Sequence, residues 1–282
     1  MRLWLGGMYP MLPQREPILD LIQLPKEKFS SIMKYHRNVL IADIGNNERN
    51  LDTRTEARKE VYARDQLMYT IHALDSTAFL EELDRVSYTI QQQIREKDIS
   101  RMQEYIRGVE DGEIRNRLKE EFQLELSLHK DFNWAGEGDD WVWLTRERIE
   151  YLSGTGHDVK QGIFIYTYPY TSDSLFQIEQ QVALRDSLLG PRILSALGDS
   201  MRVETLLPAE GRNMEWKGQF AYEMRGLWRY DNPIMGGPFV SWSLVDSQNQ
   251  RVITVDSYVF APKFDKRDYV VEMEAVIRSL VF

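Results

Sequence analysis

Alternating apolar and polar residues run through 214–262, and this pattern constrains the fold more than any other feature of the sequence. Between 219 and 230 the even positions carry large apolar side chains, namely Phe220, Tyr222, Met224, Trp228 and Tyr230. The odd positions include Glu223, Arg225 and Arg229. Because alternate side chains of a strand point to opposite faces, the pattern predicts a long strand with one face covered. Strands at 239–245 and 251–260, joined by the polar turn 247–250, extend it into an antiparallel meander.

The elements around this meander predict an α+β fold. Apolar residues recur at three- and four-residue spacing in 266–280, which indicates a closing helix on the sheet. Earlier strands are predicted at 124–128, 141–145 and 161–168, followed by a helix at 173–189. This order lacks a βαβ repeat, so it favours a mostly antiparallel sheet with packed helices.

The N-terminal part predicts a smaller ferredoxin-like α/β unit with long helices. A strand at 18–24, a helix at 25–35 and a strand at 38–44 form its first β-α-β unit. Residues 56–63 and 66–73 follow as two more strands or one bent strand. Helices then continue from the capping residues at 75–77 to about residue 122. We therefore predict two domains, 1–115 and 116–282.

Composition and charge exclude several classes of function. The net charge of −9 opposes binding to a polyanion, so we expect no nucleic-acid partner. The chain contains no Cys, which excludes disulfides, thiolate metal sites and a cysteine nucleophile. No apolar run approaches the roughly 20 residues that a membrane-spanning helix needs, so we expect no transmembrane segment.

Catalytic motifs are not evident in the sequence. The four histidines lie far apart and outside metal-ligand spacing, and no serine occupies a GxSxG turn. We therefore predict no catalytic residue, no metal and no cofactor. The alternative is a hydrolase that uses a carboxylate pair, with Asp139–Asp140 and Glu147–Glu150 available, or His157 in the glycine-containing loop 153–158.

Aromatic and arginine residues on the predicted strands give the binding candidates. They are Tyr168, Tyr170, Arg225, Trp228, Arg229 and Trp242. Large aromatic side chains of this kind either pack the core or line a groove where rings and arginines meet a sugar, a peptide or a lipid headgroup.

Several runs of residues resemble one known family. They are YPMLPQREP at 9–17, HRNVLI at 36–41, QGIFIYTYPY at 161–170, LRDS at 184–187, EMRGLW at 223–228, MGGPFVS at 235–241, and YVFAPKF followed by KRDY at 258–269. Together they are similar to the domain-of-unknown-function family numbered 4837 over nearly the whole chain. The family has no established activity, so the resemblance assigns no role to any residue.

The resemblance implies a bacterial cell-envelope or periplasmic location. Family members usually begin with a lipoprotein-type export signal and a first strand, whereas this sequence starts at Met1 inside the family pattern. We therefore expect the first strand to be missing, with a cytoplasmic location as the alternative. The order of elements in the second half is also similar to small Mog1/PsbP-type α+β domains, an analogy of fold alone. The favoured function is a non-enzymatic binding or assembly protein whose partner is an envelope protein, glycan or lipid.

Overall fold

The computed structural model describes residues 2–30, 32–110 and 112–282, and its fold is α+β as the sequence predicts. The chain forms two compact units. The N-terminal unit comprises the residues up to Met8 together with Pro17–Asp98, and the C-terminal unit comprises Tyr9–Glu16 and Ile99–Phe282. The sequence-based domains 1–115 and 116–282 stay a prediction.

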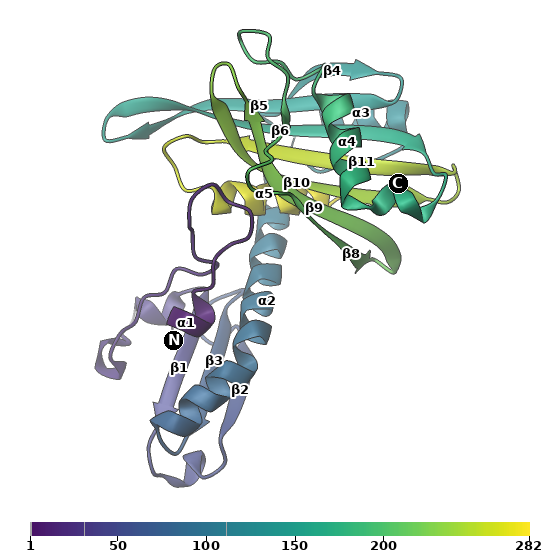
Figure 1. Ribbon diagram of the computed structural model, residues 1–282. Coiled ribbons are helices and arrows are strands. Elements are labelled where there is room, and N and C mark those ends of the chain that lie inside the picture. The colour runs from purple at the N-terminus through teal and green to yellow at the C-terminus, as the bar shows by residue number, and fades with distance from the viewer. Residues whose placement is uncertain (1, 31, 111) are drawn as a thin grey trace. The chain divides into compact units, whose positions relative to one another are not determined.

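The N-terminal unit is a three-stranded sheet with one long helix (Figure 1). Its elements are α1 (Arg2–Leu5), η1 (Lys26–Lys28), η2 (Met33–Tyr35), β1 (Asn38–Ile44), η3 (Glu48–Asn50), β2 (Arg54–Lys59), β3 (Leu67–Ala73) and the first part of α2 (Ser76–Val109). The strand order is β1-β3-β2, with β1 parallel and β2 antiparallel to β3.

One face of this small sheet is buried against α2. The odd positions of β3, from Leu67 to Ala73, pack with Phe79, Leu83, Ile90 and Ile94 of the helix. Asp75 caps the helix as predicted, since its Oδ1 accepts a hydrogen bond from the Ala78 N–H at 2.9 Å. The even positions of β3 therefore lie on the other face, which α2 does not cover.

Two N-terminal predictions are wrong. Residues 18–24 form no strand: Leu19 and Leu21 pack against the core from an irregular segment. The predicted helix 25–35 is reduced to the 3₁₀ turns η1 and η2 among its described residues, Ser31 lying outside them. A short helix is marginal in water unless it buries an apolar face, and Ile32 is exposed here.

The C-terminal unit is built on an eight-stranded sheet in the order β4-β5-β6-β11-β10-β9-β7, with β8 also paired to β9. All of its strand pairs are antiparallel, as predicted. The strands are β4 (Asn133–Gly138), β5 (Trp141–Leu152), β6 (Thr155–Pro169), β7 (Arg202–Val203), β8 (Glu210–Trp216), β9 (Gln219–Tyr230), β10 (Met235–Asp246) and β11 (Arg251–Phe260). Its helical elements are the end of α2, α3 (Glu113–Phe122), η4 (Asp173–Phe176), α4 (Ile178–Leu189) and α5 (Arg267–Ile277).

Helices cover both faces of this sheet, whereas the sequence predicted one covered face. On one face the aromatic core includes Phe164, Tyr222 and Trp228, and α4 contributes Arg185, which is hydrogen-bonded to Asp256. On the other face Arg225 of β9 contacts Glu274 of α5. Charged positions that the alternation pattern assigned to water are therefore buried.

Two further details differ from prediction. Leu124, Leu126 and Leu128 are buried, but their segment forms only an isolated bridge between Glu125 and Val281. The predicted loop 153–158 is shorter, because only Ser153 and Gly154 form the turn and Thr155 already begins β6.

Candidate functional site

Three of the six predicted binding residues belong to the interior. Trp228 and Trp242 are only 3% and 1% exposed, and Arg225 is buried as well. The Trp228 indole N–H donates to the Val259 carbonyl at 3.1 Å, and that of Trp242 donates to Glu223 at 3.0 Å. These side chains hold the sheet together and are not available to a ligand at the surface.

The six residues also fail to form one surface. Tyr168 and Trp228 pack in the aromatic core on the α4 face, whereas Arg225 and Trp242 meet through Glu223 on the α5 face. About a third of the surface of Tyr170 and of the Arg229 side chain is exposed. The Tyr170 hydroxyl donates a hydrogen bond to Asp173, and Arg229 forms an ion pair with Glu204. A binding role for these two residues stays a prediction.

Charged residues buried on the α5 face form a network around Glu223 and Arg225. Glu223 accepts hydrogen bonds from Arg225 and Arg212, each at 2.8 Å, and Arg225 contacts Glu274 at 2.6 Å. Glu274 also accepts a hydrogen bond from the Tyr9 hydroxyl at 2.6 Å. Burial alone would raise the pKa of Glu223, but the two arginines outweigh it and lower that pKa to about 2. Glu223 and Arg225 are therefore ionised and paired with each other, as in a structural network.

The carboxylates and the histidine proposed for a hydrolase do not converge. Glu147 and Glu150 are three residues apart on β5, so strand alternation places them on opposite faces. Glu147 pairs with Lys160, and Glu150 accepts a hydrogen bond from Tyr269. The His157 ring lies edge-on to Phe264, with 6.1 Å between the ring centroids.

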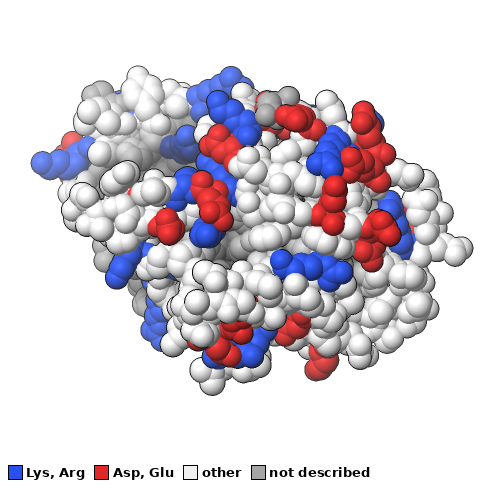
Figure 2. All heavy atoms as spheres, turned by 90° about the horizontal axis from the view of Figure 1, so that it is seen from above, with Lys and Arg blue, Asp and Glu red and all other residues white. Residues whose placement is uncertain are grey.

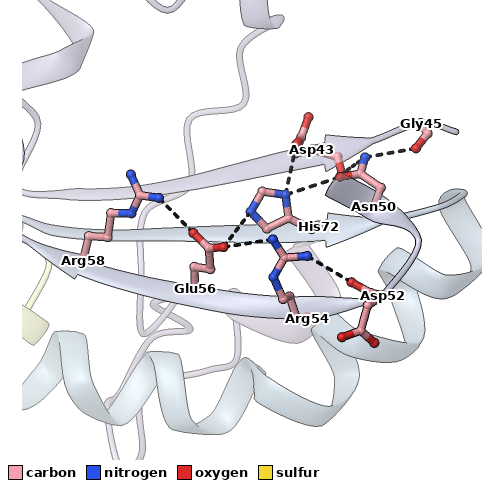
Figure 3. Close-up of polar contacts among 8 residues, drawn as sticks. All are labelled: Asp43, Gly45, Asn50, Asp52, Arg54, Glu56, Arg58 and His72. Atoms are coloured by element: carbon pink, nitrogen blue, oxygen red, sulfur yellow. Dashed lines mark hydrogen bonds and ion pairs between the residues drawn. The ribbon is translucent and has the colours of Figure 1, made fainter. Parts of the chain in front are cut away.

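A histidine between two carboxylates is the arrangement closest to an acid–base site (Figure 3). It lies on the face of the N-terminal sheet that α2 leaves uncovered. The His72 Nδ1 is 3.0 Å from Asp43 Oδ2 and 3.3 Å from Asn50 Oδ1, and its Nε2 is 3.5 Å from Glu56 Oε1. Glu56 in turn accepts hydrogen bonds from Arg58 at 2.9 Å and from Arg54 at 3.1 Å.

In this histidine cluster, comprising Asp43, Asn50, Arg54, Glu56, Arg58 and His72, both carboxylates are paired with other members, but the buried His72 Nε2 makes no hydrogen bond within the described residues and lies 3.5 Å from Glu56 Oε1. Hydrogen bonds from Arg58 and then Arg54 lower the pKa of Glu56, which keeps it ionised and unable to act as a general acid near neutral pH. Sequence reasoning missed the cluster because its residues come from three strands. The pairing of the strands brings these residues together, because Asp43 of β1 and Arg54 of β2 both lie opposite His72 of β3.

At the opposite end of the same sheet, large apolar side chains lie in water. Ile32 and Tyr35 are 75% and 63% exposed, and they project from the same side of the turn η2, because side chains three residues apart eclipse in a 3₁₀ helix. Val61 and Tyr62, in the connection between β2 and β3, are also exposed. Lys34 lies over the Tyr62 ring, 5.6 Å from its centroid.

Hydrogen bonds join these two segments into one surface. The Gln66 side-chain amide donates to the Lys34 and His36 carbonyls at 2.6 and 2.7 Å, and its Oε1 accepts from the Tyr62 N–H at 3.0 Å. Gln66 itself is fully buried. We call the surface formed by the described residues of 25–37, which leave out Ser31, together with 58–66 the basic apolar end.

The basic apolar end departs from the charge of the whole chain. Its two segments contain seven Lys or Arg residues and three Asp or Glu residues, although the chain carries a net charge of −9. On the face that Figure 2 shows, blue and red side chains lie side by side in small groups. The basic apolar end thus combines an excess of basic residues with exposed Ile and Tyr side chains.

Comparisons with known proteins reveal families and weak structural similarities. The sequence profile of DUF8532, a domain of unknown function, matches residues 2–107, and no curated protein matches the chain. The Saccharomyces cerevisiae Ran-binding protein Mog1p is similar at 12% identity and a TM-score of 0.36, over 56% of this chain and 89% of that chain. A mutant of protein Mog1 is similar at 11% identity and a TM-score of 0.35, and it too covers 56% of this chain and 89% of that chain. A Bacteroides thetaiotaomicron protein is similar at 12% identity and a TM-score of 0.22, over 56% of this chain and 44% of that chain.

A second profile, that of the domain of unknown function DUF4837, matches residues 111–279, which is more than half of the chain. The match confirms the family expected from the sequence, with the correction that the N-terminal part matches a different profile. This chain belongs to the DUF4837 family.

Proposed function

We propose that this protein is a non-enzymatic binding protein of the cell envelope, and that its basic apolar end docks on an anionic lipid surface. The observation that carries the proposal is the combination of exposed Ile32, Tyr35 and Tyr62 with an excess of basic residues over the same two segments. Tyrosine favours the membrane–water interface, where its ring is in an apolar layer and its hydroxyl is hydrated.

The electrostatic contribution follows from the local charge. A Lys or Arg side chain near an anionic membrane surface contributes about 1 kcal/mol of attraction, which salt screens. The basic apolar end therefore attracts such a surface although the chain as a whole is acidic. Within the described residues no helix is long and apolar enough to cross a membrane, so the contact proposed here is peripheral.

The non-enzymatic part of the proposal is supported by how the titratable groups are arranged. In the histidine cluster and in the network around Glu223, the charged groups lie against one another and the glutamates have lowered pKa values. A hydrolytic pair needs a carboxyl group with a raised pKa beside the reacting bond. The envelope location is an expectation from the family resemblance.

Co-sedimentation with vesicles tests the proposal. We expect the protein to sediment with phosphatidylcholine vesicles containing phosphatidylglycerol, to remain in the supernatant with pure phosphatidylcholine, and to dissociate as salt is raised. The double variant Ile32→Ser/Tyr35→Ser should bind at least tenfold more weakly.

Tyr88→Ser is the matched control, because Tyr88 is equally exposed on α2 but lies outside the basic apolar end. The control should bind like the wild type. Equal binding to both kinds of vesicle, no binding to either, or an equal loss in the control would overturn the proposal.

A further inference from the structure

The hairpin formed by β5 and β6 extends past the strands on either side of it (Figure 1). In the described chain β4 pairs with β5 only as far as Thr145, and β11 pairs with β6 only from Lys160 onward. Residues 146–152 and 155–159 therefore form a two-stranded ribbon with a free edge on each strand. A free edge presents unpaired backbone N–H and C=O groups to another strand.

The turn of the hairpin determines which backbone groups face the free edge of β5. Ser153 and Gly154 have φ values of 50° and 82°, which fit a two-residue type I′ turn closed by Leu152 and Thr155. Antiparallel pairing then alternates along β5. Leu152, Glu150 and Arg148 direct their backbone groups to β6, and the residues between them direct theirs outward.

The outward residues also carry exposed apolar side chains. Ile149 and Tyr151 are 60% and 73% exposed, and both lie over Gly156 of β6, which has no side chain to cover them. On the other face of the ribbon, Arg148 donates to Glu150 at 2.8 Å and Glu150 accepts from Tyr269 of α5 at 2.7 Å. One face of the ribbon is thus held to the unit and the other is open.

We infer that this free edge of β5 pairs with the same edge of a second copy of the chain, antiparallel and centred on Ile149. In that register Ile149 faces its own copy and Glu147 faces Tyr151, so all six outward N–H and C=O groups on the three residues are paired. Ile149 and Tyr151 of both copies then cover one another on the open face.

The charges select this register among the symmetric ones. Centring the pair on Ile149 places Arg148 opposite Glu150 of the second copy, twice. A pair centred on residue 148 would place Arg148 of one copy opposite Arg148 of the other. A pair centred on residue 150 would place Glu150 of one copy opposite Glu150 of the other. Like charges directly opposite each other destabilise a strand pair, and opposite charges stabilise it. The inference uses only the C-terminal unit and does not depend on the proposed function.

Charge exchange between two variants tests the inference in the full-length chain. Arg148→Glu should not self-associate, because it places Glu opposite Glu, and Glu150→Arg should not, because it places Arg opposite Arg. An equimolar mixture of the two variants should form a heterodimer, since each Glu then faces an Arg. Sedimentation velocity over a concentration series measures all three samples and the wild type.

Ile149→Pro is the backbone variant. Its N–H points to the free edge, so proline leaves the β5–β6 pairing intact and removes one hydrogen bond per copy, two in the proposed symmetric dimer. We expect dimer dissociation to become at least tenfold easier, with an unchanged circular dichroism spectrum.

A wild type that stays monomeric at the highest concentration reached would overturn the inference. A wild-type dimer that Ile149→Pro does not weaken, or a mixture that associates no better than its components, would also overturn it. The mixing experiment separates lost association from lost folding, because a misfolded variant would not be rescued by the other.

Discussion

Replacing Glu223 by Gln removes one charge from the buried network on β9 while keeping the shape of the side chain. Glu223 is 2% exposed and receives hydrogen bonds from Arg225, Arg212 and the Trp242 indole. Its pKa is lowered from 4.5 to about 2. At 1.36 kcal/mol per pKa unit, this shift corresponds to about 3 kcal/mol of stability.

The sign of the pH dependence follows from that shift. The pKa of Glu223 is lower in the folded than in the unfolded state, so the folded protein binds fewer protons. Its contribution is complete above pH 4.5 and disappears as pH falls from there through about 2. We expect Glu223→Gln to lower the free energy of unfolding by about 3 kcal/mol at pH 7, with the difference from wild type shrinking toward zero in acid.

Urea unfolding followed by tryptophan fluorescence measures this change, because six of the seven tryptophans belong to the C-terminal unit. Glu215→Gln is the control, since it removes the same charge from an exposed position on β8 and should cost at most about 0.5 kcal/mol. A loss below about 1 kcal/mol at pH 7, or a difference from wild type that does not change with pH, would refute the reasoning.

Two further comparisons of variants probe the packing of the C-terminal unit. A Cβ added at Gly162 would overlap the Tyr258 ring, so Gly162→Ala should lower the free energy of unfolding by about 1–3 kcal/mol in thermal unfolding. Gly108 is an exposed helical position with open space around it, so Gly108→Ala should raise the free energy of unfolding by about 0.5 kcal/mol. Equal effects at the two glycines would contradict the packing described here. Asp256→Asn should cost about 3–5 kcal/mol in urea unfolding, because the buried Arg185 loses its charged partner, and Arg185→Met/Asp256→Leu should recover most of that loss. A double variant less stable than Asp256→Asn would argue against the pair as the cause.

The antiparallel sheet and its helices were predictable because each strand carries its own signal. Alternation along β9, the polar turn before β11 and the apolar spacing in α5 are local patterns, and the structure confirms the strands and the helix that they predict. The capping role of Asp75 was equally local.

The predictions that the structure did not confirm concern contacts between residues far apart in the sequence. The alternation pattern placed Glu223 and Arg225 on a solvent-facing row. Instead α5 covers them and contributes Glu274, one of two buried glutamates on that helix. For the binding candidates Trp228 and Trp242 the sequence left open whether the rings pack the core or line a groove, and the structure buries both. Residues 18–24 are mostly apolar but have no neighbouring strand, and pattern alone does not reveal whether a partner exists.

The histidine cluster and the basic apolar end were beyond sequence reasoning for a related reason. His72, Asp43 and Glu56 meet only through the register of three strands. The exposure of Ile32 and Tyr35 could not be foreseen, because an apolar residue in a predicted helix is expected to face the core. The excess of basic residues in 25–37 was visible in the sequence. That segment 58–66 lies beside it becomes clear only from the structure, where the Gln66 side chain is hydrogen-bonded to the Lys34 carbonyl.

A fluorescent label at the basic apolar end tests the proposed membrane contact most directly. Because the chain has no Cys, Tyr62→Cys and Tyr88→Cys each provide one labelling site for an environment-sensitive dye such as NBD. With vesicles containing phosphatidylglycerol, we predict a blue shift and increased emission at position 62 and no change at position 88. Unchanged emission at position 62, or the same change at both positions, would contradict the account.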